Sequence, residues 1–279
     1  MTGLFGKLFK RRAKDPVRDV LSLTSQLAKP AIQVLVQKHA SLSHFGGSPG
    51  LPVNTPWPEK DGKKLAFLAR VSLAEAQRAS HIPWLPDTGA LLFFYDMDEQ
   101  PWGFDPRDRG RWAVLHVPDF VDRPADSHGD SESSAIRFRS MGFRRIDSFP
   151  PHEREAVASL NLTDEEREIY GEISNRPYQG APRHQMAGFP SPVQGDGMEL
   201  QCQLASHGLF CGDESGYKDP RAAALAPDAK HWRLLFQFDS DEEQLKVMWG
   251  DCGILYFWVH ESAARDGDFS NAWVVLQCC

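Results

Sequence analysis

The sequence has few cysteines, and none of them form a disulfide framework or a CxxC motif. The five cysteines are at positions 202, 211, 252, 278 and 279. An odd number of thiols without regular spacing is typical of reduced cysteines, so we expect a cytoplasmic protein. The adjacent pair Cys278-Cys279 allows two interpretations, a vicinal redox pair or incidental residues at the end of a last strand, and we favour the second.

Long apolar runs and an excess of positive charge are also missing. No run approaches the roughly 18–20 apolar residues that a membrane span needs. The formal net charge of −7 argues against a nucleic-acid partner, because phosphate binding requires clustered lysines and arginines. The basic amphipathic segment at residues 1–14 predicts a flexible tail rather than a membrane contact, because it is so short.

Motifs of catalysis and of metal or cofactor binding are absent as well. There is no G-x-S-x-G, and the glycine-rich residues 45–50 lack the Lys-Ser/Thr of a phosphate loop. Cys202 and Cys211 are too far apart in the sequence for a typical zinc ligand pair. The acidic run 239–243 lacks the glycine and the final glutamate of a calcium loop, so helix capping explains it better. We therefore expect no catalytic set, no metal and no cofactor.

The sequence does contain an internal similarity in three pairs of apolar segments. The pairs are LAFLARV at 65–71 with WRLLFQF at 232–238, TGALLFFYD at 88–96 with DCGILYFWV at 251–259, and RWAVLHV at 111–117 with AWVVLQC at 272–278. Strongly apolar runs of this length indicate strands covered on both faces. The similarity predicts an internally duplicated α+β domain with mostly antiparallel β-sheets, short flanking helices, and a groove where two pseudo-symmetric halves meet.

The same pattern suggests the domain limits. We expect a single domain over residues 15–279, with halves at about 30–117 and 182–279 joined by a variable segment at 118–181. Within that segment, residues 118–134 are rich in Pro, Asp, Ser and Gly and predict a surface loop.

Local signals predict several shorter elements. Residues 31–36 indicate a strand, and residues 174–197 have the composition of a loop. Four segments combine a capping residue with a pattern that favours a helix. They begin at Asp15-Pro16 (helix to about Leu27), Ser72 (to about Ala79), Thr163 (to about Glu172) and Asp239.

Several of these motifs together resemble the YwqG-like family of bacterial proteins. The similar segments are FGGSPGLP…WP at 45–58, LAFLARVSLAE at 65–75, GALLFFYD at 89–96, HQMAGFPSPVQ at 184–194, WRLLFQFDSD at 232–241, WGDCGILYFWV at 249–259 and FSNAWVVLQC at 269–278. The resemblance extends from about residue 30 to 279, and it implies a duplicated α+β fold but no activity, since that family has no known function. The chain departs from the family at Arg70 and Ser72, where Gln and Asp are more usual.

Polar and aromatic residues at the loop–strand junctions are the candidates for a binding site. They are Trp57, Arg70, Trp102, His184, Gln185, Gln194, Gln237, Trp249 and Asp251. Arg70 and Gln237 each interrupt an apolar strand, and an unsatisfied buried polar group costs roughly 1–3 kcal/mol. Either these two side chains tie the halves together by hydrogen bonds, or they project into a groove and hold a ligand.

Three functional hypotheses follow. We favour a binding module for a protein or a small molecule, because no catalytic set is evident. The alternatives are a hydrolase that uses His184 with an acidic or thiol partner, and an immunity or stress protein that neutralises another protein through its acidic surface.

Overall fold

The computed structural model describes residues 17–118 and 135–279. The expected tail at 1–14, the Asp15-Pro16 cap and nearly all of the expected loop at 118–134 therefore lie outside the described residues.

Nearly all described strands belong to one ten-stranded sheet in which every neighbouring pair is antiparallel. The strands are β1 (Lys29–Gln37), β2 (His44–Phe45), β5 (Ala66–Ser72), β6 (Ala90–Tyr95), β7 (Trp112–Val117), β8 (Arg139–Ser148), β9 (Gln185–Met186), β10 (Trp232–Asp239), β11 (Ile254–His260) and β12 (Trp273–Gln277). A separate hairpin pairs β3 (Glu59–Lys60) with β4 (Lys63–Lys64). The predicted α+β class with mostly antiparallel strands is confirmed.

The strand order is symmetrical about its centre, β12-β11-β10-β9-β1-β8-β2-β5-β6-β7. We call β5–β6–β7 the first meander and β10–β11–β12 the second meander. Each meander is flanked by a two-residue strand, β2 or β9. Strand β1, the first of the described strands, pairs with β9, whereas β8 pairs with β2. Each of these long strands thus pairs with the short strand that is further from it in the sequence.

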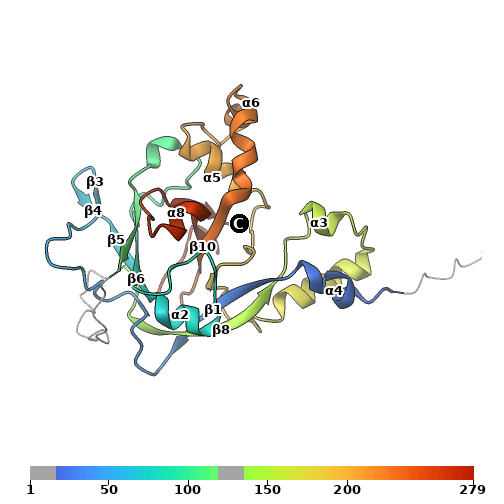
Figure 1. The fold of residues 1–279 in the computed structure, drawn as a ribbon, viewed down its shortest axis with the longest axis horizontal. Helices are drawn as coiled ribbons and strands as arrows, with labels where there is room; N and C mark the ends of the chain where they lie inside the picture. The colour runs from blue at the N-terminus through green and yellow to red at the C-terminus, as the bar shows by residue number, and fades with distance from the viewer. Residues whose placement is uncertain (1–16, 119–134) are drawn as a thin grey trace, which may run out of the picture.

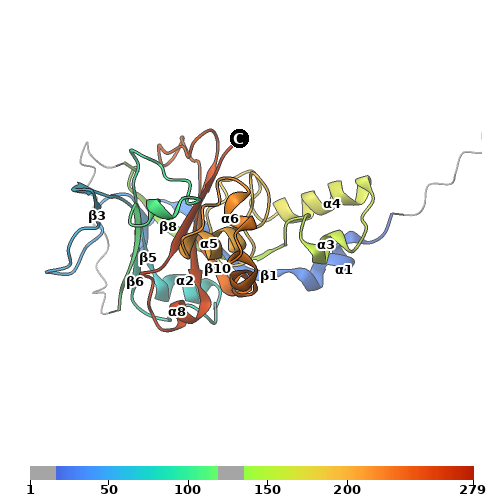
Figure 2. The ribbon, with the colours of Figure 1, turned by 90° about the horizontal axis from the view of Figure 1, so that it is seen from above.

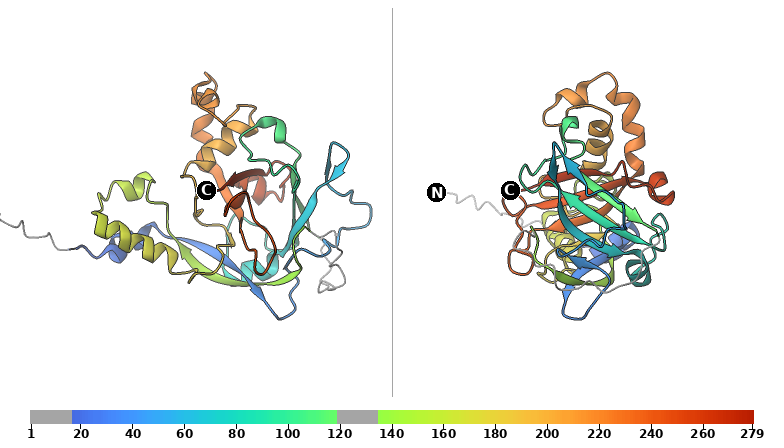
Figure 3. Two further views of the ribbon diagram at one scale, coloured as in Figure 1. Left: turned by 180° about the vertical axis from the view of Figure 1, so that it is seen from behind. Right: turned by 90° about the vertical axis from the view of Figure 1, so that its left-hand side faces the viewer.

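The sheet curves until its two edge strands meet (Figure 3). Trp112 of β7 donates a 2.9 Å hydrogen bond from Nε1 to the carbonyl of Ala272, and its ring centroid is 4.9 Å from that of Trp273. Trp273 in turn donates from Nε1 to the carbonyl of Gly103 at 2.7 Å. The sheet is therefore nearly closed, and two tryptophans form its seam.

Aromatic rings fill the inside of the curved sheet. Phe45, Phe93, Phe236, Phe238 and Phe257 are fully or almost fully buried, and their ring centroids form contacts between 4.0 and 6.4 Å. They come from β2, β6, β10 and β11, so both meanders contribute. The space in which the sequence predicts a groove is occupied by this packing.

The central strands of the two meanders are buried on both faces, as their apolar sequences predict. All of β6 and all of β11 except His260 are buried. On the outer side of the first meander, Leu51 and Trp57 pack against Leu92 and Phe94. Loops thus cover the outer face, which explains why the strands do not alternate between apolar and polar residues.

The helices are short and lie around the sheet. They are α1 (Val20–Thr24), α2 (Leu73–Ala79), α3 (Glu155–Ala158), α4 (Asp164–Asn175), α5 (Met198–Ser206), α6 (Ser215–Lys218), α7 (Ala222–Leu225) and α8 (Glu261–Arg265). None of the helices within 17–118 and 135–279 combines the length and the apolar character that crossing a membrane demands.

Helices α1, α3 and α4 form a lobe beyond the ends of β1 and β8 (Figures 1 and 2). This helical lobe has a hydrophobic cluster of its own, made of Val20, Val157, Leu162, Tyr170 and Ile173. The predicted capping box of Thr163 and Glu166 is confirmed at the start of α4. The helix continues to Asn175, one turn beyond the expected end.

Three local predictions need correction. The amino-terminal helix begins at Val20 with Asp19 as its cap, and it tightens into a 3-10 turn at Ser25–Leu27. Residues 174–197 include part of α4 and the short strand β9, which is too brief to leave a periodic signal. Helix α2 exists as predicted, but the Ser72 side chain forms no cap hydrogen bond.

The helix expected to begin at Asp239 is absent. Asp241 instead forms an isolated bridge with Val247, and its carboxylate accepts from the backbone amide of Gln244 at 2.9 Å. Lys246 and Gly250 have left-handed φ angles of 61° and 53°, which a right-handed helix cannot include. The Asp241 side chain therefore stabilises a turn rather than a helix.

Candidate functional site

Arg70 and Gln237 occupy equivalent places in the two meanders, and each fastens a loop. Arg70 donates from Nε to the carbonyl of Leu42 at 2.7 Å, and Gln237 donates from Nε2 to the carbonyl of Arg183 at 2.7 Å. Leu42 lies two residues before His44, which pairs with Arg70. Arg183 likewise lies two residues before Gln185, which pairs with Gln237. These bonds connect each strand to the loop beside it rather than tying the two halves together.

His184 has a fixed protonation pattern because a backbone amide can only donate. The amide of Asp239 donates to Nδ1 of His184 at 3.1 Å, so the ring hydrogen is on Nε2. Nε2 lies 3.6 Å from Oδ2 of Asp241, and both side chains are buried. Burial acts to raise the pKa of Asp241, but His184 and two backbone amides outweigh it, and the pKa falls below its usual value.

This arrangement resembles a catalytic Asp–His pair, yet it lacks the free nitrogen. A general base accepts a proton on an imine nitrogen that faces the substrate. In His184 that nitrogen is Nδ1, which is already bonded to the amide of Asp239. The pair is therefore built to hold the turn at Asp241 against β9.

Gln185 and Gln237 belong to a row of polar side chains that anchors the loop at residues 187–195. Gln185 donates from Nε2 to the carbonyls of Ala187 and Phe189. Gln237 Oε1 accepts from the Ser191 amide, and Tyr256 Oη donates to the Ser191 carbonyl. Gln277 Oε1 accepts from the amides of Val193 and Gln194. Gln194 joins this network only through its backbone, and its side chain is exposed. The loop that these side chains anchor covers the outer face of the second meander.

Trp102, Trp249 and Asp251 lie near the end of β12. The carbonyl of Trp102 accepts from the amide of Leu276 at 3.2 Å, and the carbonyl of Asp251 accepts from the amide of Cys279 at 3.0 Å. Trp249 is fully buried and packs edge-on against Tyr95. Trp102 and Asp251 thus connect loops to the edge of the sheet, whereas Trp249 belongs to the buried core.

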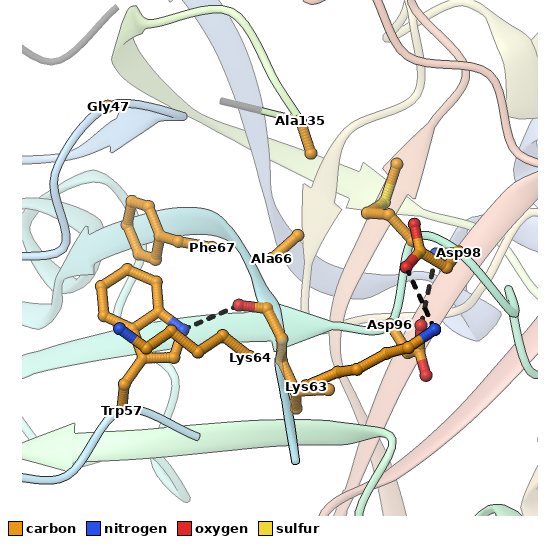
Figure 4. Close-up of a pocket in the computed structure, with 11 residues that line it drawn as sticks. Gly47, Trp57, Lys63, Lys64, Ala66, Phe67, Asp96, Asp98 and Ala135 are labelled. Carbon is orange, nitrogen blue, oxygen red and sulfur yellow. Dashed lines mark hydrogen bonds and ion pairs between the residues drawn. The ribbon is translucent and has the colours of Figure 1, made fainter. Parts of the chain in front are cut away.

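Trp57 lines a cavity of about 460 Å³ on the outer side of the first meander (Figure 4). Its indole Nε1 donates to the carbonyl of Leu65 at 2.8 Å, and its ring meets Phe94 edge-on with centroids 5.4 Å apart. The other lining residues are Gly47, Lys63, Lys64, Leu65, Ala66, Phe67, Asp96, Met97, Asp98 and Ala135. The indole is therefore held in place by two contacts and still half-exposed to the cavity.

The charged groups around this cavity are unequally paired. Asp96 accepts from Arg111 at 2.6 Å, and Lys63 lies 3.8 Å from Asp98. Lys64 places its ammonium 5.9 Å from the ring centroid of Trp57, and the ion pairs of the described residues do not include it. An aromatic wall and the Lys64 ammonium thus face the same space.

The other lining residues of this cavity were not predicted from the sequence, although a signal was present. Lys63 and Lys64 follow Asp61-Gly62, a dipeptide that favours a two-residue hairpin turn. Both turn residues have positive φ angles, 54° and 76°, as that turn requires. The hairpin was obscured because its strands are only two residues long and carry charged side chains.

Fold and cavity together define an α+β protein with a nearly closed antiparallel sheet and a lined depression on its outer face. Residues 43–278 match the family described as Domain of unknown function (DUF1963), and the chain belongs to that family. The matched segment contains both meanders and β8, whereas β1 precedes it. No curated protein matches this chain.

Proposed function

We propose that this protein is a binding module and that its ligand occupies the cavity at Trp57. The observation that carries the proposal is the fixed indole, which is held by Leu65 and Phe94 before any ligand arrives. A side chain that needs no reordering loses little entropy on binding. The cavity volume of about 460 Å³ falls within the roughly 300–1,000 Å³ of small-molecule sites.

The lining predicts the chemistry of the ligand. Trp57 and Phe67 offer aromatic surface, which favours a planar or apolar body. Lys64 offers an ammonium that forms no ion pair with the described residues, which favours a carboxylate or another anionic group on the same molecule. We therefore infer a small ligand, or the side chain of a bound protein, that joins a flat apolar part to a negative charge.

Two small probes test this proposal, indole-3-acetate and its neutral analogue indole-3-ethanol. We expect the carboxylate to bind more tightly, as measured by the chemical shifts of tryptophan indole protons during NMR titration. Lys64→Ala should weaken the binding of indole-3-acetate about tenfold, because a charge-assisted hydrogen bond to a ligand is worth roughly 1.5–3 kcal/mol. Lys63→Ala is the matched control and should change binding little, since Lys63 already faces Asp98.

The aromatic wall is tested by Trp57→Ala, which should abolish the binding of both probes. Trp102→Ala is its control, because Trp102 is also partly exposed but lies outside the cavity. Equal affinities for both probes would reject the role of Lys64. If neither probe shifts any tryptophan, the cavity is rejected as a site for this ligand class.

We also infer that the two meanders derive from one duplicated unit, which divides the domain into halves at about 30–117 and 182–279. Matched hydrogen bonds support this inference. The carbonyl of Ser43 accepts from the Met141 amide at 2.9 Å, and the carbonyl of His184 accepts from the Val34 amide at 2.9 Å. The motif agreement noted above supports a place in the YwqG-like group.

A further inference from the structure

Two exposed thiols lie on neighbouring segments at one end of the second meander. Of the five cysteines, Cys252 and Cys279 are exposed and the other three are buried. The β11–β12 ladder ends with the pair Ile254 and Gln277. Beyond that pair, the amide of Cys279 donates to the carbonyl of Asp251 at 3.0 Å, so the two segments remain side by side.

This arrangement separates Cys279 from its sequence neighbour Cys278. A Cβ atom placed on Gly253 would lie 2.7 Å from Cβ of Cys278, and one on Gly250 would lie 2.8 Å from its Sγ. The Cys278 side chain therefore fills the space over two glycines and is 7% exposed. The Cys279 thiol lies close enough to Cys252 to raise its pKa, and a disulfide spans Cα atoms about 4.4–6.8 Å apart, a separation found between neighbouring antiparallel segments.

We propose that Cys252 and Cys279 form a reversible intramolecular disulfide. The oxidant is a low-molecular-weight disulfide. The thiolate of one cysteine attacks a sulfur of this oxidant, forms a mixed disulfide and releases one small thiol. The second cysteine then attacks the protein sulfur of the mixed disulfide and releases the other small thiol. The protein loses two electrons and two protons, and the small disulfide gains both.

The surroundings of Cys252 set the conditions of this exchange. Partial desolvation, the Asp251 carboxylate and the Cys279 thiol raise the pKa of Cys252 above its usual value. The Cys252 thiolate is therefore scarce at neutral pH, and we expect faster exchange as the pH rises. Burial raises the pKa of the Cys211 thiol to about 11 and acts in the same direction on Cys202, so these two thiols should react slowly.

The test incubates the native protein with oxidised glutathione. We expect two of the five thiols to disappear in a titration with Ellman's reagent, together with an intact mass lower by two hydrogens. Dithiothreitol should restore both thiols. Loss of no thiol, or addition of glutathione without release of the second half, would overturn the proposal.

Three serine variants identify the pair. Cys252→Ser and Cys279→Ser should each stop at the mixed disulfide, whereas the matched control Cys278→Ser should still form the internal bond. If Cys278→Ser stops at the mixed disulfide while Cys279→Ser still forms the internal bond, the assignment is overturned. Dimers on a non-reducing gel would overturn it as well. Far-UV circular dichroism checks that each variant is folded, which we expect for Cys252 and Cys279 because both are exposed.

Discussion

At the scale of single residues, the buried imidazole of His44 is unusual. Its Nδ1 donates to the carbonyl of Gly46 at 2.7 Å, so Nε2 has the lone pair. The ring packs against Phe67 and Phe138, and Nε2 has no hydrogen-bond partner among the described residues. Burial, with the nearby Arg70 guanidinium, lowers the pKa of His44 to about 4. His44 therefore remains neutral in the folded state at physiological pH.

This lowered pKa predicts acid sensitivity. An unfolded histidine titrates near 6.5, so between about pH 6.5 and 4 the unfolded chain binds a proton that the folded chain does not. Stability is fully present above that range and falls as the pH drops, by up to about 1.4 kcal/mol for each pH unit. His44→Gln, which keeps a donor for Gly46, should reduce this fall.

Urea unfolding at pH 7 and pH 5 measures the effect, with His39→Gln as a control at an exposed position. If His44→Gln and the unmodified chain lose the same stability between these pH values, His44 does not titrate as argued.

The residues proposed for a site show what a single sequence reveals about side chains. Gln237 interrupts an apolar strand, and that alone indicates that a partner exists. Its partners are a carbonyl and an amide of loops about fifty residues away, at Arg183 and Ser191, and no local pattern points to them. Trp57 could be named as a candidate from the sequence because a rigid loop carries it. Lys64 could not, since an exposed lysine becomes informative only when its neighbours are known.

At the scale of elements, two helices that begin with the same capping sequence offer a matched comparison. Thr163 forms both hydrogen bonds of a capping box with Glu166. Ser72 precedes α2 with the same spacing to Glu75, yet Glu75 turns away from the helix. Its carboxylate accepts from the hydroxyls of Ser41 and Ser43 and from the amides of Leu42 and Ser43. Glu75 therefore holds the loop before β2, and α2 relies on packing.

We predict that Thr163→Ala lowers the free energy of unfolding by about 1 kcal/mol, the usual value of a lost cap. Ser72→Ala should cost less than about 0.5 kcal/mol, because no cap bond is lost. Glu75→Ala should cost about 2–3 kcal/mol, since buried donors lose a charged acceptor. Urea unfolding of the three variants checks this order. A larger loss for Ser72→Ala than for Glu75→Ala would contradict it.

The strands also differ in how well they could be predicted from the sequence. Strands β5, β6, β10, β11 and β12 were predicted because long apolar runs leave few alternatives. Strand β8 was missed, because Arg144, Arg145 and other polar residues along it are partly or fully exposed. Strand β8 pairs with β1 over nine positions. Its place in the sheet therefore depends on the sequence of β1 as well as on its own.

At the scale of the whole molecule, the helical lobe and the sheet should differ in stability. The lobe depends on a small separate cluster and on ion pairs such as Arg18 with Glu166, at 2.6 Å. The Arg18 hydrogen bond holds the pKa of Glu166 well below its usual value, so this contribution exists at neutral pH and is lost in strong acid. The sheet is stabilised by a continuous core that includes both meanders.

We therefore predict that amide hydrogens of α4 exchange at least about tenfold faster than those of β6 and β11. Hydrogen-exchange mass spectrometry measures this difference directly. Glu166→Gln should widen it by weakening the contact with Arg18, whereas Asp164→Asn at an exposed position is the control. Equal protection of lobe and sheet would mean that the molecule opens only as one cooperative unit.

The crossed positions of β1 and β8 affect how the chain assembles. Strand β1 is made before the other described strands, but its two neighbours, β8 and β9, lie more than a hundred residues further along. Contacts between distant segments form slowly, because a long loop must be closed before they contribute stability. The short strand at the inner edge of each meander, β2 or β9, does not pair with the long strand that precedes it in the sequence. During synthesis the first meander must therefore wait, with β2 unpaired on one side, until the ribosome has delivered β8.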